Sequence, residues 1–133
     1  MHTPYEQRLK HKADFRVKYK FYTKEKGGRS EMPFQGYRSD FWYSNEEHKK
    51  NELFMIWPEF EDANGQVFLE NDRAVSEEGT ARMWIIIPER RNYHKDKIKA
   101  GIKGFFREGG TSTAECEVIE IIGLNENPTE SRK

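Results

Sequence analysis

A strict alternation of apolar and basic residues near the start of the chain constrains its fold most strongly. The apolar members are Phe15, Val17, Tyr19 and Phe21, and the basic members between them are Arg16, Lys18 and Lys20. A repeat of two residues is typical of a β-strand, whose successive side chains point to opposite faces, and not of an α-helix with its repeat of ~3.6 residues. The sequence therefore predicts a half-buried strand with one apolar and one basic face.

Further stretches carry strand signals and are bounded by glycine, proline or polar residues. They are 40–44, 53–57, 66–70, 83–87, 98–106 and 113–122. Two are continuous apolar runs ended by Pro58 and Pro88, as expected for buried strands. After Val118 the apolar phase flips by one residue, which indicates a β-bulge. No segment longer than about 10 residues carries a helical stripe, so the sequence predicts an all-β barrel or sandwich.

Length and composition indicate one small domain with a very polar surface. The chain has 133 residues, of which 35% are hydrophobic and 35% charged, and a mean hydropathy of −1.03. Eighteen aromatic residues supply the large side chains that a small core needs. We expect a flexible basic arm over residues 1–12, a single barrel domain over 13–124, and a disordered polar tail over 125–133.

The sequence also predicts where the chain resides. No apolar run approaches the ~20 residues of a transmembrane helix, and the first residues lack the apolar region of a signal peptide. Cys116 is the single cysteine, so the chain has no internal disulfide. These features predict a cytoplasmic protein with no membrane partner.

Charge is balanced overall but segregated along the chain. The net charge is zero, yet residues 5–29 carry +6, residues 46–78 carry −7, residues 89–107 carry +5 and residues 108–133 carry −4. One interpretation is a surface that faces nucleic acid or acidic groups. The other is that solvent-facing strand positions alternate in charge for solubility. The zero net charge argues against a dedicated DNA-binding protein.

Motifs of catalysis and of cofactor binding are missing from the sequence. There is no phosphate loop, no dinucleotide-binding glycine fingerprint and no His-Glu-x-x-His motif. The four histidines, His2, His11, His48 and His94, are scattered among polar residues, so we expect no metal site. Cys116 lies on the apolar face of a predicted strand and is expected to fill the core. We therefore expect no enzymatic activity and no cofactor.

Two glycine-rich elements remain as candidate binding sites. The first runs from Lys24 through Gly27-Gly28-Arg29 to Gly36-Tyr37-Arg38, and the second is Arg107-Glu108-Gly109-Gly110-Thr111. Paired glycines allow sharp turns and the close approach of a partner. The adjacent arginines suit phosphate or carboxylate groups. Alternatively, both are tight turns whose arginines pair with nearby acids such as Glu25 or Glu108.

Taken together, these two elements resemble a known protein family. The alternating strand, Gly27-Gly28-Arg29, Gly36-Tyr37-Arg38 and the aromatic residues 41–43 resemble the opening of the C-terminal β-barrel (third domain) of elongation factor Tu. Residues 102–111 resemble its last hairpin. The resemblance implies a six-stranded antiparallel barrel, and one or two loops of this sequence, near 45–75 and 89–97, are longer than those of the family. It also implies a domain that binds no nucleotide itself, and that contacts the tRNA backbone and the exchange factor in the full elongation factor.

The sequence departs from this family at several positions. Ser30 stands where the family has histidine, Ser39-Asp40 where it has proline-glutamine, and Thr111 where it has arginine. A carboxylate at Asp40 repels phosphate, so these changes weaken a phosphate-binding surface. The GTPase domain and the second barrel of the family are also missing.

These observations lead to two functional hypotheses. The first is a stand-alone binding module, associated with translation, that docks on tRNA or other RNA, or on a translation protein, without hydrolysing GTP. Its predicted contact residues are Arg29, Ser30, Arg38, Asp40, Arg107, Gly109 and Gly110. The alternative is a protein–protein interaction or immunity-type module that mimics the barrel. In that case residues 46–78, with Trp42, Trp57 and Phe60, are expected to contact a protein partner.

Overall fold

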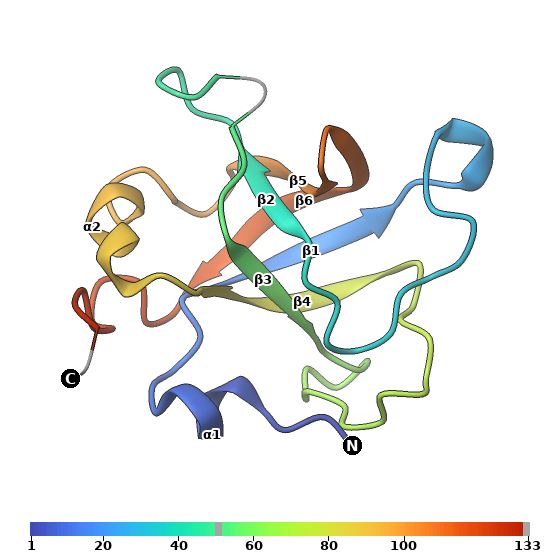
Figure 1. The fold of residues 1–133 in the computed structure, drawn as a ribbon, viewed down its shortest axis with the longest axis horizontal. Coiled ribbons are helices and arrows are strands. Elements are labelled where there is room, and N and C mark those ends of the chain that lie inside the picture. Colours follow the sequence, from blue (N-terminus) through green and yellow to red (C-terminus); the bar gives the residue numbers. More distant parts are fainter. Residues whose placement is uncertain (50–51, 132–133) are drawn as a thin grey trace.

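The chain folds into one curled sheet that forms half a barrel (Figure 1). A computed structural model describes residues 1–49 and 52–131. Its strands are β1 (Phe15–Phe21), β2 (Asp40–Tyr43), β3 (Ile56–Phe60), β4 (Glu78–Ile85), β5 (Lys103–Glu108) and β6 (Thr111–Ile121). All neighbours are antiparallel, in the order β2-β5-β6-β1-β4-β3. The prediction of an all-β, six-stranded antiparallel fold is therefore confirmed.

The two edges of the sheet approach each other just before β3. Phe41 on β2 and Phe54 exchange both backbone hydrogen bonds, at 3.0 and 3.1 Å. Pro58 lies within β3, and it is tolerated there because β3 is an edge strand with one backbone side unpaired in the sheet. The apolar run 53–57 was predicted as a strand ended by this proline. The strand instead begins at Ile56 and continues through Pro58.

The alternating segment that led the sequence analysis is central in the sheet. Strand β1 pairs with both β4 and β6, and its apolar side chains face the interior with exposed fractions of 0–4%. The register against β6 shifts between Arg16 and Val17, which face Glu120 and Val118. Ile119 is therefore the extra residue, and the bulge predicted after Val118 is confirmed.

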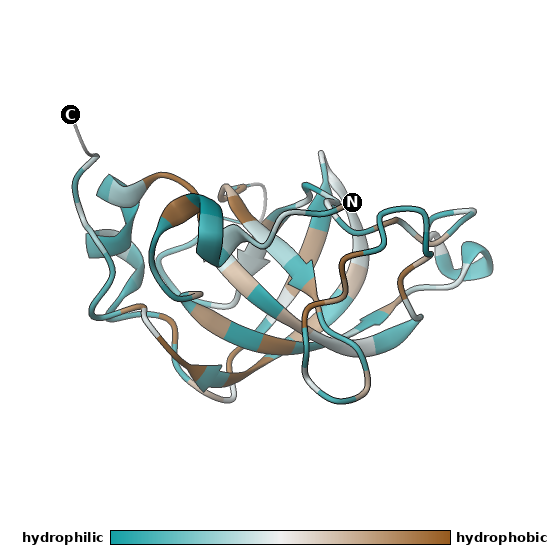
Figure 2. Ribbon diagram, turned by 90° about the horizontal axis from the view of Figure 1, so that it is seen from below, coloured by the Kyte–Doolittle hydropathy of each residue, from teal (hydrophilic) through white to brown (hydrophobic). Residues whose placement is uncertain are grey.

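Aromatic rings fill the interior of the curled sheet. Tyr19, Phe21, Phe60 and Phe106 are buried, and their ring centroids lie 5.2–6.2 Å apart in mutual contact. Each buried ring contributes on the order of 1.5–3 kcal/mol to folding, so a short chain reaches a stable core with few residues. Figure 2 shows brown, hydrophobic segments between teal, hydrophilic ones along the strands.

Two of the predicted strands differ in the structure. Residues 66–70 form no strand, and the chain there pairs only through the bridge between Glu61 and Val67. The Asp62 side chain accepts backbone hydrogen bonds from Asn64 and Gln66, and the resulting turn brings Val67 back beside Glu61. Residues 98–102 also precede, rather than begin, β5, which starts at Lys103.

Helical segments are short and lie at the ends of the barrel. They are α1 (Tyr5–Leu9), η1 (Lys24–Lys26), η2 (Pro88–Arg90) and α2 (Arg91–His94), where η marks a 3₁₀ turn. None of the helices in the described part of the chain has the length and apolar character needed to cross a membrane.

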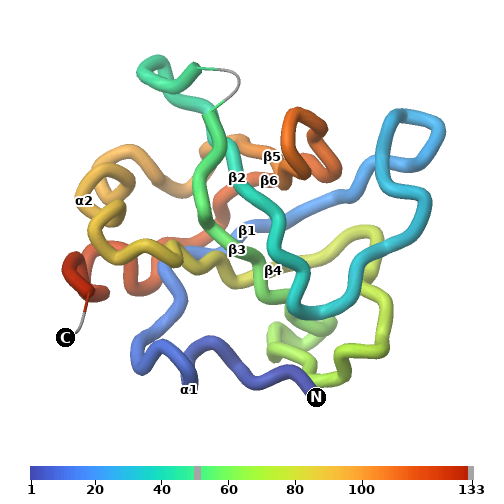
Figure 3. Tube along the Cα trace, in the orientation of Figure 1, coloured from blue at the N-terminus to red at the C-terminus, as the bar shows by residue number. Residues whose placement is uncertain are grey.

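Both ends of the chain contact the barrel. Tyr5 of α1 is 4% exposed, and its N–H donates to the Glu59 carboxylate at 2.9 Å. At the other end, Asn127 donates to Asp14 at 2.9 Å, and the C-terminal segment runs beside α2 (Figure 3). The sequence predicted a loose arm and tail, because single buried residues such as Tyr5 carry no periodic signal. Residues 132–133 of the predicted tail and 50–51 of the predicted long loop lie outside the described residues.

Candidate binding site

The two glycine-rich elements lie together in the structure. The Arg29 guanidinium donates from Nη1 to Glu108 Oε2 at 2.6 Å, although the two residues are 79 positions apart. Tyr37 lies between the elements, and its hydroxyl donates to the same carboxylate oxygen at 2.6 Å. The Arg29 guanidinium also lies over the Tyr37 ring, 5.3 Å from its centroid. The fold thus places both elements at one surface.

That surface is neutralised by its own residues. Burial raises the pKa of the Glu108 carboxyl, but hydrogen bonds from Tyr37 and Arg29 outweigh it, so the net shift is downward. Glu108 is therefore ionised at neutral pH and compensates the charge of Arg29. Arg29 therefore fits the alternative interpretation from the sequence, in which the arginines of these turns pair with nearby acids.

Most of the remaining predicted contact residues lie in or beside the two glycine-rich elements, whereas Arg38 lies against β3. Arg107 donates from Nη2 to the Gly110 carbonyl oxygen at 3.1 Å, and it faces Asp40 in the register of β2 and β5. Gly109 has a φ of +59°, a left-handed conformation that favours glycine. Ser30 is exposed beside Arg29. Arg38 has other neighbours, because its guanidinium lies 4.6 Å from the Trp57 ring centroid on β3.

Two of the three basic residues of β1, Arg16 and Lys18, are paired with acidic residues. Arg16 contacts Glu61 at 2.8 Å and Glu120 at 2.9 Å, and Lys18 lies 3.7 Å from Glu117. These contacts join the basic segment near the N-terminus to acidic residues on β6 and just after β3. The segregated charges of the sequence therefore meet across the sheet. This arrangement fits the interpretation that the charges of solvent-facing strand positions serve solubility.

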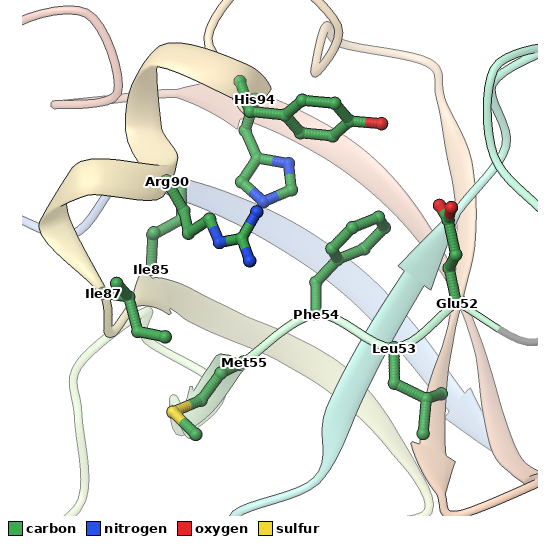
Figure 4. A pocket seen from close by; sticks show the side chains of 9 residues that line it. Glu52, Leu53, Phe54, Met55, Ile85, Ile87, Arg90 and His94 are labelled. Atoms are coloured by element: carbon green, nitrogen blue, oxygen red, sulfur yellow. The ribbon is translucent and has the colours of Figure 1, made fainter.

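A pocket that the sequence did not indicate lies where β3 begins and β4 ends. It has a volume of about 360 Å³ (Figure 4). Its walls come from the segment before β3 and from the end of β4 with the helical turns that follow: Glu52, Leu53, Phe54, Met55, Ile85, Ile87, Arg90, Tyr93 and His94. The Ile86 N–H donates to the Met55 carbonyl oxygen at 3.1 Å, so the β3–β4 pairing continues one step beyond the strands. Pro88 then starts η2 and turns the chain over this edge.

Three large apolar side chains around this pocket are exposed. Leu53 is 39%, Met55 44% and Ile87 40% exposed, and we call this group the apolar rim. In Figure 4, Leu53 and Met55 point away from His94 whereas Phe54 points toward it, as expected for extended backbone. The apolar run 53–57 predicted a strand that is buried throughout, and this prediction is wrong for Leu53 and Met55. An apolar run at a sheet edge exposes every second residue unless another element covers it.

His94 forms the polar floor of the pocket. It is 1% exposed, and its Nδ1 lies 2.7 Å from the Tyr43 hydroxyl oxygen. Burial, together with the nearby His48, Lys97 and Arg90, lowers the pKa of His94 to about 3. The imidazole is therefore neutral at physiological pH, and the floor carries no charge.

Arg90 supplies the positive charge of the pocket. It is exposed, and within residues 1–49 and 52–131 it forms no ion pair. Figure 4 shows its guanidinium reaching toward His94, with Glu52 at the opposite end of the pocket. The site thus combines apolar walls, one unpaired cation and one carboxylate.

Comparisons with other proteins leave the family open. The sequence matches no known protein-family model and no curated protein. Within the described ranges 1–49 and 52–131, no three His, Cys, Asp or Glu side chains are grouped so as to hold a metal ion. The resemblance to the elongation factor Tu barrel stays a prediction from the motifs.

Proposed function

We propose that this chain is a binding module that docks on a protein partner through the apolar rim and has no catalytic activity of its own. The observation that carries the proposal is the exposure of Leu53, Met55 and Ile87 around one pocket. Large apolar side chains that gather on a surface mark interaction sites more often than isolated ones do. Burying them against a partner removes apolar area from water, which drives protein association.

The charge of the pocket indicates the kind of partner. Arg90 is exposed and has no ion-pair partner among the described residues. A partner that inserts an apolar side chain and places a carboxylate beside Arg90 complements both features. We therefore infer a partner surface with an apolar anchor and adjacent acidic residues. If the resemblance to the elongation factor barrel holds, translation proteins are the first candidates.

The competing hypothesis, docking on RNA phosphates, loses much of its support. Arg29 is compensated by Glu108, and the basic residues Arg16 and Lys18 of β1 face acidic partners. Binding to RNA phosphates gains free energy when cations of the protein replace the counterions of the RNA. Cations that are already paired with carboxylates contribute less free energy to such binding.

The experiment compares the protein with two single variants on a support exposed to cell lysate. Met55→Asp places a charge in the apolar rim, and Leu69→Asp is the matched control, since Leu69 is 36% exposed and lies outside the rim. Retained protein and RNA are both identified at about 50 mM and about 300 mM salt, a range over which phosphate-driven binding falls steeply. Circular dichroism verifies that both variants fold.

We expect one protein to be retained at both salt concentrations by the parent chain and by Leu69→Asp, and to be lost with Met55→Asp. Retention of tRNA at low salt, shed at high salt and unchanged by Met55→Asp, contradicts the proposal and supports RNA docking instead.

A further inference from the structure

A second hollow, of about 320 Å³, lies where α1 meets the loop before β2. Its lining side chains include two arginines, Arg8 and Arg38, and the polar residues His2, Thr3 and Asn71. No carboxylate lines it, and neither arginine forms an ion pair with any described residue. These two cations differ from Arg16 and Arg29, which are paired with carboxylates.

Aromatic rings position both guanidinium groups. Arg8 lies over the ring of Tyr5, 5.7 Å from its centroid, and Arg38 lies over Trp57 at 4.6 Å. Stacking on a ring face holds a guanidinium while its N–H donors remain at the edge of the plane. Both arginines also lie close enough to Tyr5 to act on its pKa, which burial nevertheless raises. Both cations therefore lie near the Tyr5 side chain.

A buried carboxylate, Glu59, holds two of the residues that line this hollow, His2 and Tyr5. Glu59 is 1% exposed, accepts the Tyr5 N–H at 2.9 Å and the Trp84 Nε1–H at 3.1 Å, and lies 2.6 Å from His2 Nε2. Tyr5 also packs edge-on against Trp84 with centroids 5.8 Å apart. Glu59 is thus engaged beneath the surface, and the charge that the hollow presents to solvent comes from Arg8 and Arg38.

We propose that this hollow binds the phosphomonoester group of a small soluble molecule. Two guanidinium groups match the nearly double negative charge and the three terminal oxygens of such a group, since each can donate two hydrogen bonds to adjacent oxygens. A carboxylate offers two oxygens and one charge, and so engages only one guanidinium fully. This site is separate from the apolar rim, so the phosphate-binding proposal does not depend on the protein-docking proposal.

The test titrates the full chain with inorganic phosphate and then with acetate, followed by the indole N–H signals in NMR spectra. Because Arg38 lies on Trp57, anion binding is expected to shift the Trp57 signal, which a Trp57→Phe variant assigns. Arg8→Gln and Arg38→Lys are compared with Arg73→Gln. Arg73 is a matched control, since it is exposed and stacks on Phe68 at 4.6 Å but does not line this hollow.

We expect phosphate to bind more tightly than acetate, and the dissociation constant for phosphate to rise roughly tenfold with Arg8→Gln, as for the loss of one charged hydrogen-bonding group. Arg38→Lys keeps the charge but loses the planar fork, so a smaller rise is expected. No saturable shift at millimolar phosphate, or an equal loss of affinity with Arg73→Gln, overturns the proposal. Binding to vesicles that contain phosphatidic acid, without binding to soluble phosphate, overturns the choice of a soluble ligand.

Discussion

Arg29 and Glu108 are 79 positions apart in the sequence, yet they form an ion pair of 2.6 Å that joins the two glycine-rich turns. The Tyr37 hydroxyl donates to the same oxygen, so two side chains donate to one carboxylate oxygen of Glu108. The pair explains why these turns lie together. It also removes Arg29 from the set of free cations that RNA docking requires.

The energy of this pair is measurable by a double-mutant cycle with Arg29→Ala and Glu108→Ala. The two side chains are 31% and 39% exposed, so we expect a coupling energy of at most about 1 kcal/mol from urea unfolding. Lys18 and Glu117, 3.7 Å apart, form a looser pair and serve as the control with a smaller coupling. A coupling of zero at Arg29 and Glu108 would show that the pair does not organise the turns.

The neutral His94 predicts a specific dependence of stability on pH. Its pKa is about 3 in the folded chain, against about 6.5 when unfolded, so the unfolded chain binds more protons below pH 6.5. The contribution of neutral His94 to stability is complete above about pH 6.5 and declines as the pH falls toward 3, by at most about 1.4 kcal/mol per pH unit. Urea unfolding between pH 7 and 5 measures this slope.

In His94→Gln the slope is expected to be flatter over that range, although the variant is less stable at pH 7 because the Tyr43 contact changes. His11→Gln is the control for loss of an imidazole, since the half-buried His11 ring contacts the Lys12 carbonyl oxygen at 2.8 Å and lies 3.5 Å from Arg91. Equal slopes in the parent chain and in His94→Gln would contradict a buried, neutral His94.

Gly104 is predicted to tolerate no side chain. A Cβ at this position would lie 2.5 Å from the Trp42 carbonyl oxygen and 2.8 Å from the Phe41 ring. Gly104→Ala is therefore expected to lower the free energy of unfolding by about 1–3 kcal/mol, the usual effect of overpacking. Gly110→Ala is the control, because a Cβ there meets no atom within 4 Å. Thermal unfolding compares the two, and similar melting temperatures would disprove the packing argument.

Asp14 and Arg91 form a buried ion pair at 2.7 Å, with exposed fractions of 0% and 1%. Removing one member leaves the other charge buried and unpaired. Arg91→Met is expected to cost about 3–5 kcal/mol. The double variant Asp14→Asn with Arg91→Met is expected to recover part of that loss, measured by urea unfolding at pH 7. If the single and double variants are equally unstable, the loss comes from packing and not from the unpaired charge.

Much of the sheet was predictable from the sequence. The period-two pattern of residues 15–21 depends only on strand geometry, and it correctly predicted the buried face of β1. The flip after Val118 likewise predicted the bulge in β6. The stretch 66–70 was not predictable in this way, because a strand needs a neighbour to pair with along its length, and this stretch forms only the bridge between Glu61 and Val67.

The candidate sites likewise combine features that the sequence predicted with features that it did not. The sequence by itself determined the alternation that makes β1 half-buried, the positions of the glycine turns and the zero net charge. Tertiary structure decided that Arg29 is compensated by Glu108, that Leu53 and Met55 are exposed, and that Arg8 and Arg38 share one hollow. The physical reason is that periodicity fixes which way a side chain points along its own strand. Charge pairing and burial depend instead on residues far away in sequence that the curled sheet brings within a few ångströms.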